Sequence, residues 1–520
     1  MSLINKLFDD LLLWRSDKIT KITWWTIVAG IIWMVLSAID ALMVRIQVSS
    51  WAVFQDLIFT NQQYYASITL HAIRALFLFA MPSLMLVLSY ITVKLYGLEA
   101  RKVNLLWIGW VLNEIIAAIF WEGPIIFNSS AFDSYFSATM WYFLAPIGLP
   151  YYSNYVVSPF WYFAWLLHFV FVYLWVYWEV YHLRLALQKK RKLDYVGAFI
   201  LSSTLIIAIG YLGVTFSTSW LTLSWISSWL SNPPLIPVNS LINQVFFWVF
   251  GHAVVYMAFV PALTLLYYLV PLISGKKIYS ERAAIIAAFL YLIASPVVPL
   301  HHLYLTPLPD IAKDINAFFT YLVVVPSVMT VFNLWATATR DNGFKWNVPS
   351  AFVALSFYAI LVGGVTGIIN GDPTSAPIIH NTEWVPAHFH TMIWAIVSSA
   401  TAGLYILIPT FFGRAWYSIK MAWFHFFLTA VSIIGMNSSW FLIASDQAFI
   451  RRAETFPITP SSEYGTVFLT AFAILYGIAQ LIWVINIVNT AFSGRRFTGE
   501  MSVSEVLETT LMTSLRGGRK

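Results

Sequence analysis

Twelve long apolar runs constrain this chain more than any other feature of its sequence. Hydrophobic residues make up 60% of the 520 residues, and charged residues only 10%. A helix needs roughly 20 apolar residues to cross about 30 Å of hydrocarbon, so each run is a candidate membrane span. The sequence therefore predicts an all-α polytopic membrane protein, a bundle of twelve transmembrane helices. The runs cover about 22–46, 67–93, 103–121, 159–183, 195–228, 241–273, 283–302, 315–337, 349–370, 384–412, 420–444 and 464–492.

The basic residues indicate how the bundle is oriented. If the N-terminus is cytoplasmic, successive loops alternate sides, and most of the 29 Lys and Arg residues fall on the inner side. This positive-inside bias predicts a plasma-membrane protein with both termini in the cytoplasm. The same bias accounts for the net charge of +6 without a nucleic-acid partner. The exceptions on the outer side are Arg45, Arg74, Lys313, Arg451 and Arg452.

The spans divide the chain into three expected parts. Residues 1–21 form an inner-surface N-terminal segment, 22–492 a single twelve-helix membrane domain, and 493–520 a cytoplasmic tail. The first 20 residues are polar and charged and lack the apolar core of a signal peptide, so no cleavable signal is expected. Because the membrane domain takes up most of the chain, the sequence predicts the lipid bilayer as the first partner.

Six of the ten histidines share one depth in the predicted bundle. The topology comes from Lys and Arg alone, yet it puts all six in the outer half of the membrane. Ionisable groups inside a membrane are costly, and by default they indicate function. The six are His71, His252, His301, His302, His388 and His390. Ordinary hydrogen bonding between helices is the expected role of the scattered His168, His182 and His425.

The six histidines can divide between three metal ions. The sequence contains no cysteine, which excludes iron–sulfur clusters, covalently attached c-type haem and thiolate-bound copper within this chain. His388 and His390 project about 200° apart on a helix, so one helix can ligate two centres. His71 and one member of that pair can be the axial ligands of a saturated haem, and the other member can hold a second haem from one side. The remaining His252, His301 and His302 can bind copper, with Pro296 and Pro299 loosening the helix before the adjacent pair.

Tyr256 adds a redox-active group to this arrangement. It lies four residues after His252, on the same helix face one turn further on. Full reduction of dioxygen takes four electrons, of which an iron and a copper supply three. A tyrosine beside them can supply the fourth together with a proton. A purely structural tyrosine is the alternative.

In these motifs the chain resembles subunit I of the haem–copper oxidases over nearly its whole length. The motifs follow in order: one histidine in the second span, Gly251-His252-x-x-Val255-Tyr256, His301-His302, and His388-Phe389-His390. The resemblance implies two haems, of a or b type, and one copper ion. It implies that His71 and His390 ligate the low-spin haem and His388 the high-spin haem. It further implies a copper site of His252, His301 and His302, with Tyr256 joined covalently to the copper-ligand histidine.

Departures from the family pattern resemble its B-type branch, found in prokaryotes and archaea. Val254 stands where the large proton-pumping branch has a glutamate, and the eighth span lacks that branch's lysine. Tyr267, Ser327 and Thr330 resemble the B-type proton path, in which hydroxyls relay protons from the inside. Plain hydrogen bonding between helices is an equal alternative for Ser327 and Thr330. Ala253 replaces the usual proline and leaves the local helix geometry open.

Three outer-side groups match the expected haem propionates. Arg451 and Arg452 resemble the family's arginine pair and can donate charge-assisted hydrogen bonds to propionates. His380 resembles a B-type residue near a high-spin haem propionate, with Asp372 as its candidate partner. For Arg74, one turn after His71, a haem substituent or a buried acid such as Glu114 is the candidate contact.

The resemblance implies the catalytic subunit of a respiratory terminal oxidase. Such a subunit reduces O2 to water, takes protons from the inside and conserves energy as a proton gradient. Electrons would come from quinol, or from a cytochrome or blue-copper protein through a subunit II-like partner, alongside other membrane subunits. A nitric oxide reductase of the same superfamily is one alternative, against which Tyr256 argues. A twelve-helix transporter without redox chemistry is the alternative from another class.

Overall fold

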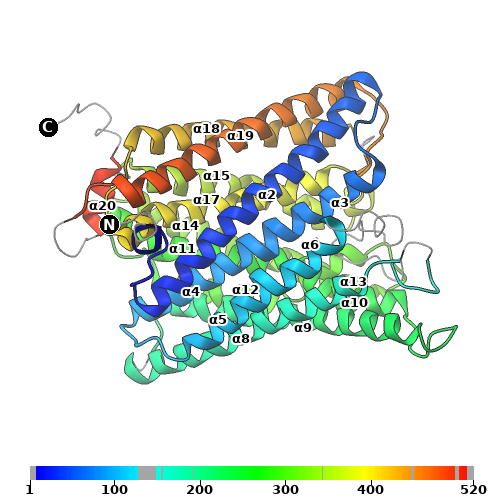
Figure 1. Cartoon of the computed structure of the whole chain (residues 1–520), viewed down its shortest axis with the longest axis horizontal. Coiled ribbons are helices and arrows are strands. Elements are labelled where there is room, and N and C mark those ends of the chain that lie inside the picture. The colour runs from blue at the N-terminus through cyan, green and yellow to red at the C-terminus, as the bar shows by residue number, and fades with distance from the viewer. Residues whose placement is uncertain are drawn as a thin grey trace.

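The computed structural model describes residues 7–126, 148–153, 156–190, 192–341, 344–446, 450–497 and 503–511. Over these residues the chain is a bundle of long helices, and its only extended pairings are isolated bridges. Twelve helical segments are long and apolar enough to span a membrane. They lie side by side along the long dimension of the molecule (Figure 1). The predicted fold class, a twelve-helix membrane bundle, is confirmed.

Several spans consist of two or three consecutive helical elements. The spans are α2 (Lys18–Phe54); α3, η2 and α4 (Asn61–Ala72, Ile73–Ala80, Met81–Leu95); α5, η3 and α6 (Val103–Val111, Leu112–Ala117, Ala118–Ile126); α8 (Pro159–Lys190); α9 (Tyr195–Ser227); α10 and α11 (Ser240–Gly251, Ala253–Ser274); α12 and η4 (Glu281–Ala294, Val298–Leu303); α13 and α14 (Asp310–Leu322, Val324–Thr339); α15 (Val348–Gly371); α17 (Trp384–Phe412); α18 (Ile419–Ser445); and α19 (Pro460–Ser493). The short elements are η1 (Leu7–Leu11), α16 (Ala376–Ile379) and α20 (Val503–Thr509).

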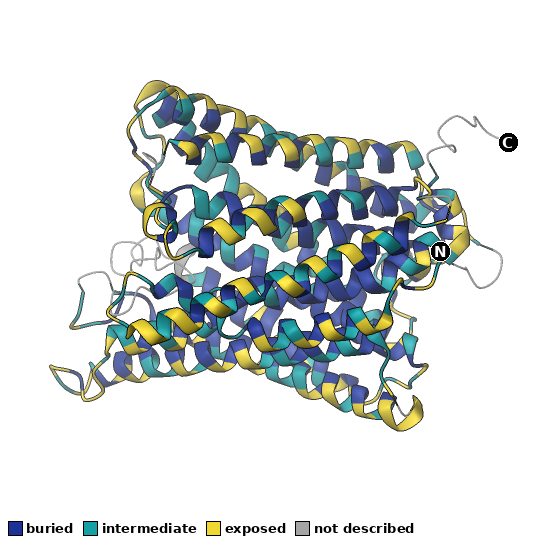
Figure 2. Cartoon of the chain, turned by 180° about the vertical axis from the view of Figure 1, so that it is seen from behind, coloured by how far each residue is buried: buried dark blue, intermediate teal, exposed yellow. Residues whose placement is uncertain are grey.

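The three spans at the centre of the bundle are the ones that carry most of the six histidines. The apolar window of α10–α11 is 89% buried, that of α3–α4 is 83% buried and that of α17 is 78% buried, more than in any other span. The outer helices instead carry many exposed large apolar residues, as a surface against lipid requires, and Figure 2 shows exposed positions recurring along their ribbons. The histidines therefore lie in the helices that are most shielded by protein.

The central helices depart from regular α-helix where the histidines stand. His71 is followed by a π-helical stretch, Ile73–Ala80. The sixth span breaks at His252, between the end of α10 and the start of α11. The seventh span leaves α-helix at Ala294, and His301 and His302 lie on the 3₁₀ turn η4. Pro296 and Pro299 explain this last change, because proline cannot donate the hydrogen bond that continues a helix.

Both ends of the described chain, η1 and α20, lie at the same end of the bundle (Figure 1). The first span begins at Lys18 rather than near residue 22, because Asp17 caps it through the N–H of Thr20. α20 packs on α11 and α17. The cytoplasmic position of this end and the three-part division of the chain stay predictions. Most of the outer loop 122–158 lies outside the described residues.

Candidate metal and haem centre

Three histidines from two broken helices converge on one point. The candidate ligand atoms of His252, His301 and His302 all lie within 4.8 Å of one another. His252 Nδ1 is 3.0 Å from His302 Nε2. The Nε2 atom of His301 is buried and has no hydrogen-bond partner among the described residues. Three imidazoles whose candidate ligand nitrogens lie this close together are a ligand set that suits copper, so the residues fit the ion that the sequence implies.

Contacts with neighbouring side chains hold the rings of this three-histidine cluster in place. His301 Nδ1 lies 3.3 Å from Thr320 Oγ1 of α13, and His302 Nδ1 lies 2.5 Å from His380 Nε2. Trp248 stacks on His302 with the ring centroids 4.2 Å apart and an 8° angle between the planes. Contacts of this kind orient metal ligands and set which nitrogen is free. Trp248 and Thr320 carry no signal in a single sequence that marks them for this role.

The second histidine group is a facing pair, His71 and His390. Their ring centroids are 6.3 Å apart and the ring planes differ by 10°. Metal–imidazole bonds are about 2 Å long, so this separation leaves space for one metal between the two rings. His390 Nδ1 donates to the carbonyl of Pro386 at 2.8 Å, and His71 Nδ1 lies 3.0 Å from the carbonyl of Ser37. With Nδ1–H bonded in this way, each Nε2 keeps its lone pair for a metal.

His388 projects from α17 on the side away from His390. It lies within electrostatic reach of His252 and His301, whereas His390 lies within such reach of His71. The 200° separation expected for an i, i+2 pair thus divides the two rings between the two groups. The Oγ1 atom of Thr366 lies 3.1 Å from His388 Nδ1, which again leaves Nε2 free.

Glycines of α15 make room for these rings. A Cβ on Gly367 would lie 2.8 Å from Cε1 of His388, and a Cβ on Gly371 would lie 2.6 Å from Thr320 Cγ2 and 3.3 Å from His301 Nδ1. Gly363, one turn earlier, faces Met392 in the same way. Small residues at i, i+4 and i+8 allow close helix approach in membranes. This four-residue spacing is visible in the sequence and could have identified α15 as the helix behind the site.

Tyr256 lies against the cluster, as its i+4 position predicts. Its ring centroid is 5.2 Å from that of His252, with a 40° tilt between the planes. The side chain is half-buried. The helix break at His252, where Ala253 replaces proline, therefore does not separate the two rings.

The outer arginine pair meets the loop before α17. Arg451 N–H donates to the carbonyl of Asn381 at 3.1 Å, and a bridge joins Thr382 to Ile450. Arg452 has φ of +70°, an uncommon backbone conformation for a non-glycine residue that marks a constrained turn. Burial, followed by the two arginines, lowers the pKa of His380 to about 4, so this ring is neutral at pH 7.

Two further charged groups join this outer region. Glu383 is buried and accepts a 2.6 Å hydrogen bond from Trp440 Nε1, and burial raises the pKa of its carboxyl group. Arg45 of α2 lies within electrostatic reach of Glu383. Its Nε and Nη2 atoms are buried without a hydrogen-bond partner among the described residues. Buried guanidinium nitrogens normally have an acceptor, so Arg45 adds a donor for an anion such as a propionate. The sequence analysis noted Arg45 only as a basic residue on the outer side of the predicted topology.

Arg74 contacts buried acids, which is one of the two alternatives that the sequence left open, but Glu114 is not among them. Its guanidinium pairs with Asp40 at 2.6 Å and with Glu122 at 2.7 Å, because the outer ends of α2 and α6 bring these acids closer. Glu114 instead accepts from the indole of Trp33 at 2.8 Å.

Asp372 is not the partner of His380, as the sequence suggested, because His380 contacts His302 instead. The carboxylate of Asp372 accepts hydrogen bonds from Thr374, Tyr321 and the N–H of Ser375. These bonds close the turn after α15 and hold the pKa of Asp372 below its ordinary value. The residue therefore has a local structural role.

The hydroxyls of the expected proton path lie between α11 and α14. Tyr267 and Thr330 are buried and close enough to interact, although neither hydroxyl makes a hydrogen bond of regular geometry within the described residues. Ser327 accepts a 2.9 Å hydrogen bond from Tyr291 of α12. Tyr291 is fully buried, and the sequence analysis missed it, because one tyrosine among twenty-seven carries no pattern.

The other three histidines are bonded between or within helices, as expected. His168 lies 2.6 Å from Asn113 Oδ1 and 2.8 Å from the Tyr211 hydroxyl. His425 lies 2.8 Å from the hydroxyl of Tyr405. His182 lies 2.9 Å from the carbonyl of Trp178, one turn earlier in α8.

Comparisons with known proteins agree with this geometry. The family model for cytochrome c and quinol oxidase polypeptide I matches residues 21–479. Quinol oxidase subunit 1 of Sulfolobus acidocaldarius is 28% identical over 280 residues, covering 52% of this chain and 52% of that protein. Cytochrome c oxidase subunit 1 of Thermus thermophilus is 25% identical over 476 residues, covering 86% and 80%. The match thus spans about half the length of the first relative and four-fifths of the second.

A solved structure shares the fold. It is described as a heme–copper terminal oxidase dimer, at 18% identity and a TM-score of 0.78. The superposition covers 94% of this chain and 86% of that one. At this identity the likeness concerns the arrangement of the helices.

Proposed function

The chain belongs to the haem–copper oxidases as a subunit I, and from this membership we propose that it is the catalytic subunit of a respiratory terminal oxidase, reducing O2 to water. One observation carries the proposal. The six histidines form a cluster of three, a facing pair, and His388 between them on the helix of His390. When bound there, two haems and one copper ion would supply the one-electron chemistry that O2 reduction needs.

The protein's own residues divide the tasks between two centres. His71 and His390 would together ligate the low-spin haem, which would supply electron transfer. His388 would ligate the high-spin haem, and His252, His301 and His302 would bind copper. α17 carries ligands of both haems only two residues apart, so it would be the short route for electrons between them.

Tyr256 would deliver an electron and a proton to the reacting dioxygen. Its ring lies beside His252, which would be a copper ligand. The likeness of this pair to the family's covalently joined histidine and tyrosine supports the role. A nitric oxide reductase would not need this group.

Protons would reach Tyr256 from the inner side through hydroxyl groups. Tyr267, Thr330 and Ser327 provide such groups, and the Tyr291 hydroxyl extends the line from Ser327. Buried hydroxyls without protein partners cost free energy unless water bonds them, so waters beside Tyr267 and Thr330 would complete the relay. Uptake of these protons from the cytoplasm would conserve energy as a proton gradient across the plasma membrane.

On the outer side, Arg451, Arg452 and Arg45 would neutralise the haem propionates. The neutral His380, bonded to the copper ligand His302, would stand where protons leave. Electrons would enter from quinol or from a cytochrome or blue-copper protein by way of a subunit II-like partner. The two relatives are named a quinol oxidase and a cytochrome c oxidase, so both kinds of donor occur among them.

A reduced-minus-oxidised spectrum of the purified complex, combined with metal analysis, tests the proposal. We expect two spectrally distinct haems and one copper per chain, together with oxygen consumption. Iron without copper would favour the nitric oxide reductase. A sample with no haem absorption, unchanged by dithionite, would favour a transporter and overturn the proposal.

A further inference from the structure

Trp440 of α18 covers one face of the His390 ring. The two ring centroids are 4.2 Å apart and the planes differ by 32°. The rings of Phe389 and Trp394, both on the same helix as His390, are 5.8 Å and 6.1 Å away and are tilted by 85° and 49°. Among the described residues, Trp440 is therefore the nearest aromatic contact of this ring, and it comes from another span.

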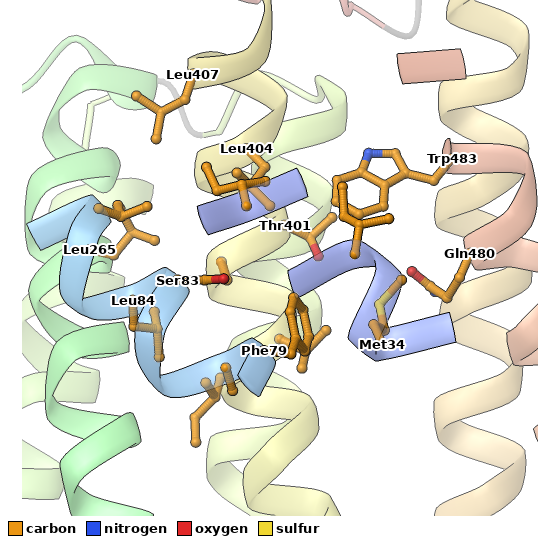
Figure 3. Close-up of a pocket in the computed structure, with 17 residues that line it drawn as sticks. Met34, Phe79, Ser83, Leu84, Leu265, Thr401, Leu404, Leu407, Gln480 and Trp483 are labelled. Atoms are coloured by element: carbon orange, nitrogen blue, oxygen red, sulfur yellow. The ribbon is translucent and has the colours of Figure 1, made fainter. Parts of the chain in front are cut away.

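The apolar space between five spans lies elsewhere on α17. From Ile396 to Leu407 the helix faces this space, and Phe79, Leu265 and Trp483 are among the other side chains around it (Figure 3). Neither His390 nor Trp440 is one of its lining residues. Its nearest lining residue on α17 is six positions beyond His390, about 9 Å along the helix. The contacts that set the plane of the His390 ring are therefore to be found on α18 and on the first turns of α17.

A buried carboxyl group fixes the position of the Trp440 indole. Trp440 Nε1 donates to Glu383 Oε2 at 2.6 Å, and only 8% of Trp440 and 5% of Glu383 is exposed. Glu383 is the N-cap residue of α17. Glu383, Pro386 and His390 follow one another at i, i+3 and i+7, so they share one face of the helix, and helical side chains lean toward the N-terminus. The His390 ring thus lies over the turn on which the indole is anchored.

Two contacts define the plane of the His390 ring. The hydrogen bond from Nδ1 to the Pro386 carbonyl, 2.8 Å long, holds one edge. A carbonyl oxygen accepts hydrogen bonds over a broad range of directions, so this bond alone lets the ring tilt about that edge. The indole of Trp440 blocks a tilt toward α18. In the resulting position the His390 plane differs from that of His71 by only 10°.

The angle between two axial imidazoles matters to the metal between them. Each imidazole donates π electrons perpendicular to its own plane. Parallel rings therefore act on the same metal d orbital, whereas perpendicular rings act on two different orbitals and make them nearly equal in energy. This orbital splitting determines the g values of a ferric low-spin haem in electron paramagnetic resonance, and perpendicular rings raise the largest g value. Contacts outside the ligands tune a metal in this way.

We propose that Trp440 is a positioning residue of the low-spin site, whose indole, anchored by Glu383, holds the His390 ring parallel to that of His71. The inference rests on the proposed function, since it requires a haem between these two histidines. Trp440 acts on that haem through His390. A tryptophan that only filled the space between α17 and α18 would lower stability when replaced, but it would not move the g values.

Electron paramagnetic resonance of the oxidised complex tests this role. We expect the wild type to show the signal of parallel axial rings. Trp440→Leu removes both the ring face and the anchor, so the largest g value should rise. Trp440→Phe keeps an aromatic face but loses the N–H group, and the value should rise by less. Trp423→Leu is the matched control, because Trp423 is also a buried tryptophan of α18 but packs on Phe426 and Phe427. It should keep the wild-type g values.

Glu383→Gln separates the anchor from the charge. Its amide oxygen still accepts the indole N–H, so the g values should stay those of the wild type. A shift as large as that of Trp440→Phe would mean that the charge acts instead, and would overturn the inference.

Three further results would also overturn it. They are unchanged g values in either Trp440 variant, loss of the low-spin haem from Trp440→Phe, and a shift in Trp423→Leu. If Trp440→Leu does not assemble, Trp440→Phe decides. A wild-type signal of perpendicular rings would overturn the inference and leave the proposed oxidase intact, whereas a wild-type complex without a low-spin haem would defeat the proposed function.

Discussion

The three-histidine cluster and the facing pair differ in the backbone that presents them. His390 stands within α17 and His71 near the end of α3, so register between helices is enough to bring their rings parallel. The cluster needs a helix break at His252 and a 3₁₀ turn at His301 and His302. A pair of ligands can thus be built from helix geometry, whereas three ligands around one ion require irregular backbone.

The two groups also differ in what fixes their rings. In the pair, Nδ1 of each ring bonds a backbone carbonyl, of Pro386 and of Ser37, and His71 Nδ1 also lies 2.9 Å from Ser37 Oγ. In the cluster, His301 and His302 contact side chains instead, those of Thr320 and His380 respectively. Side-chain supports can be removed by single substitutions and carbonyls cannot. We therefore expect the cluster to be the more fragile of the two and to be separable from the pair.

His302→Ala should break the cluster alone and has the largest expected effect. Without this imidazole the copper ion loses one of three ligands, so oxygen reduction and copper binding should both be abolished. The low-spin spectrum should persist, because neither His71 nor His390 depends on His302. Metal analysis and a reduced-minus-oxidised spectrum measure the two outcomes. Loss of the low-spin signal would contradict the division of ligands.

His71→Ala is the reciprocal change. It should remove the low-spin haem selectively and leave copper at its wild-type level, since the cluster takes no support from α3. Turnover should stop because electrons no longer reach the second centre. If copper is lost together with the low-spin haem, the two groups are not independent.

Tyr256→Phe keeps the ring and removes only the hydroxyl group. Both haems and copper should stay bound, while turnover falls by about 10²–10⁴-fold, the usual range for loss of a positioned proton donor. The buried Tyr405→Phe, whose hydroxyl bonds His425 away from the site, is the matched control and should retain activity. Near-normal turnover of Tyr256→Phe would remove the residue from the reaction.

The same contrast separates what the sequence predicted from what it could not. Hydropathy predicted the twelve spans, and helix periodicity predicted that His388 and His390 face different centres. Periodicity also put Tyr256 beside His252. The supporting contacts were not predicted, because they depend on which helices pack together, and a single sequence does not reveal this. They are the contacts of Trp248 with His302, of Thr320 with His301, and of Arg45 with Glu383. The same dependence on packing explains why the sequence could not say which buried acids pair with Arg74, which are Asp40 and Glu122 rather than Glu114.

Gly367→Ala tests the most local of these packing contacts and has the smallest expected effect. The new Cβ would lie 2.8 Å from Cε1 of His388, so the ring or α15 must shift, at a cost of about 1–3 kcal/mol. We expect weaker occupancy of the high-spin haem and a several-fold loss of turnover, with the His71–His390 spectrum unchanged. Gly364→Ala, three residues earlier on α15, meets nothing within 4 Å. It should leave activity intact and stabilise the helix slightly, by about 0.4–1 kcal/mol. Equal behaviour of the two variants would show that α15 does not set the position of His388.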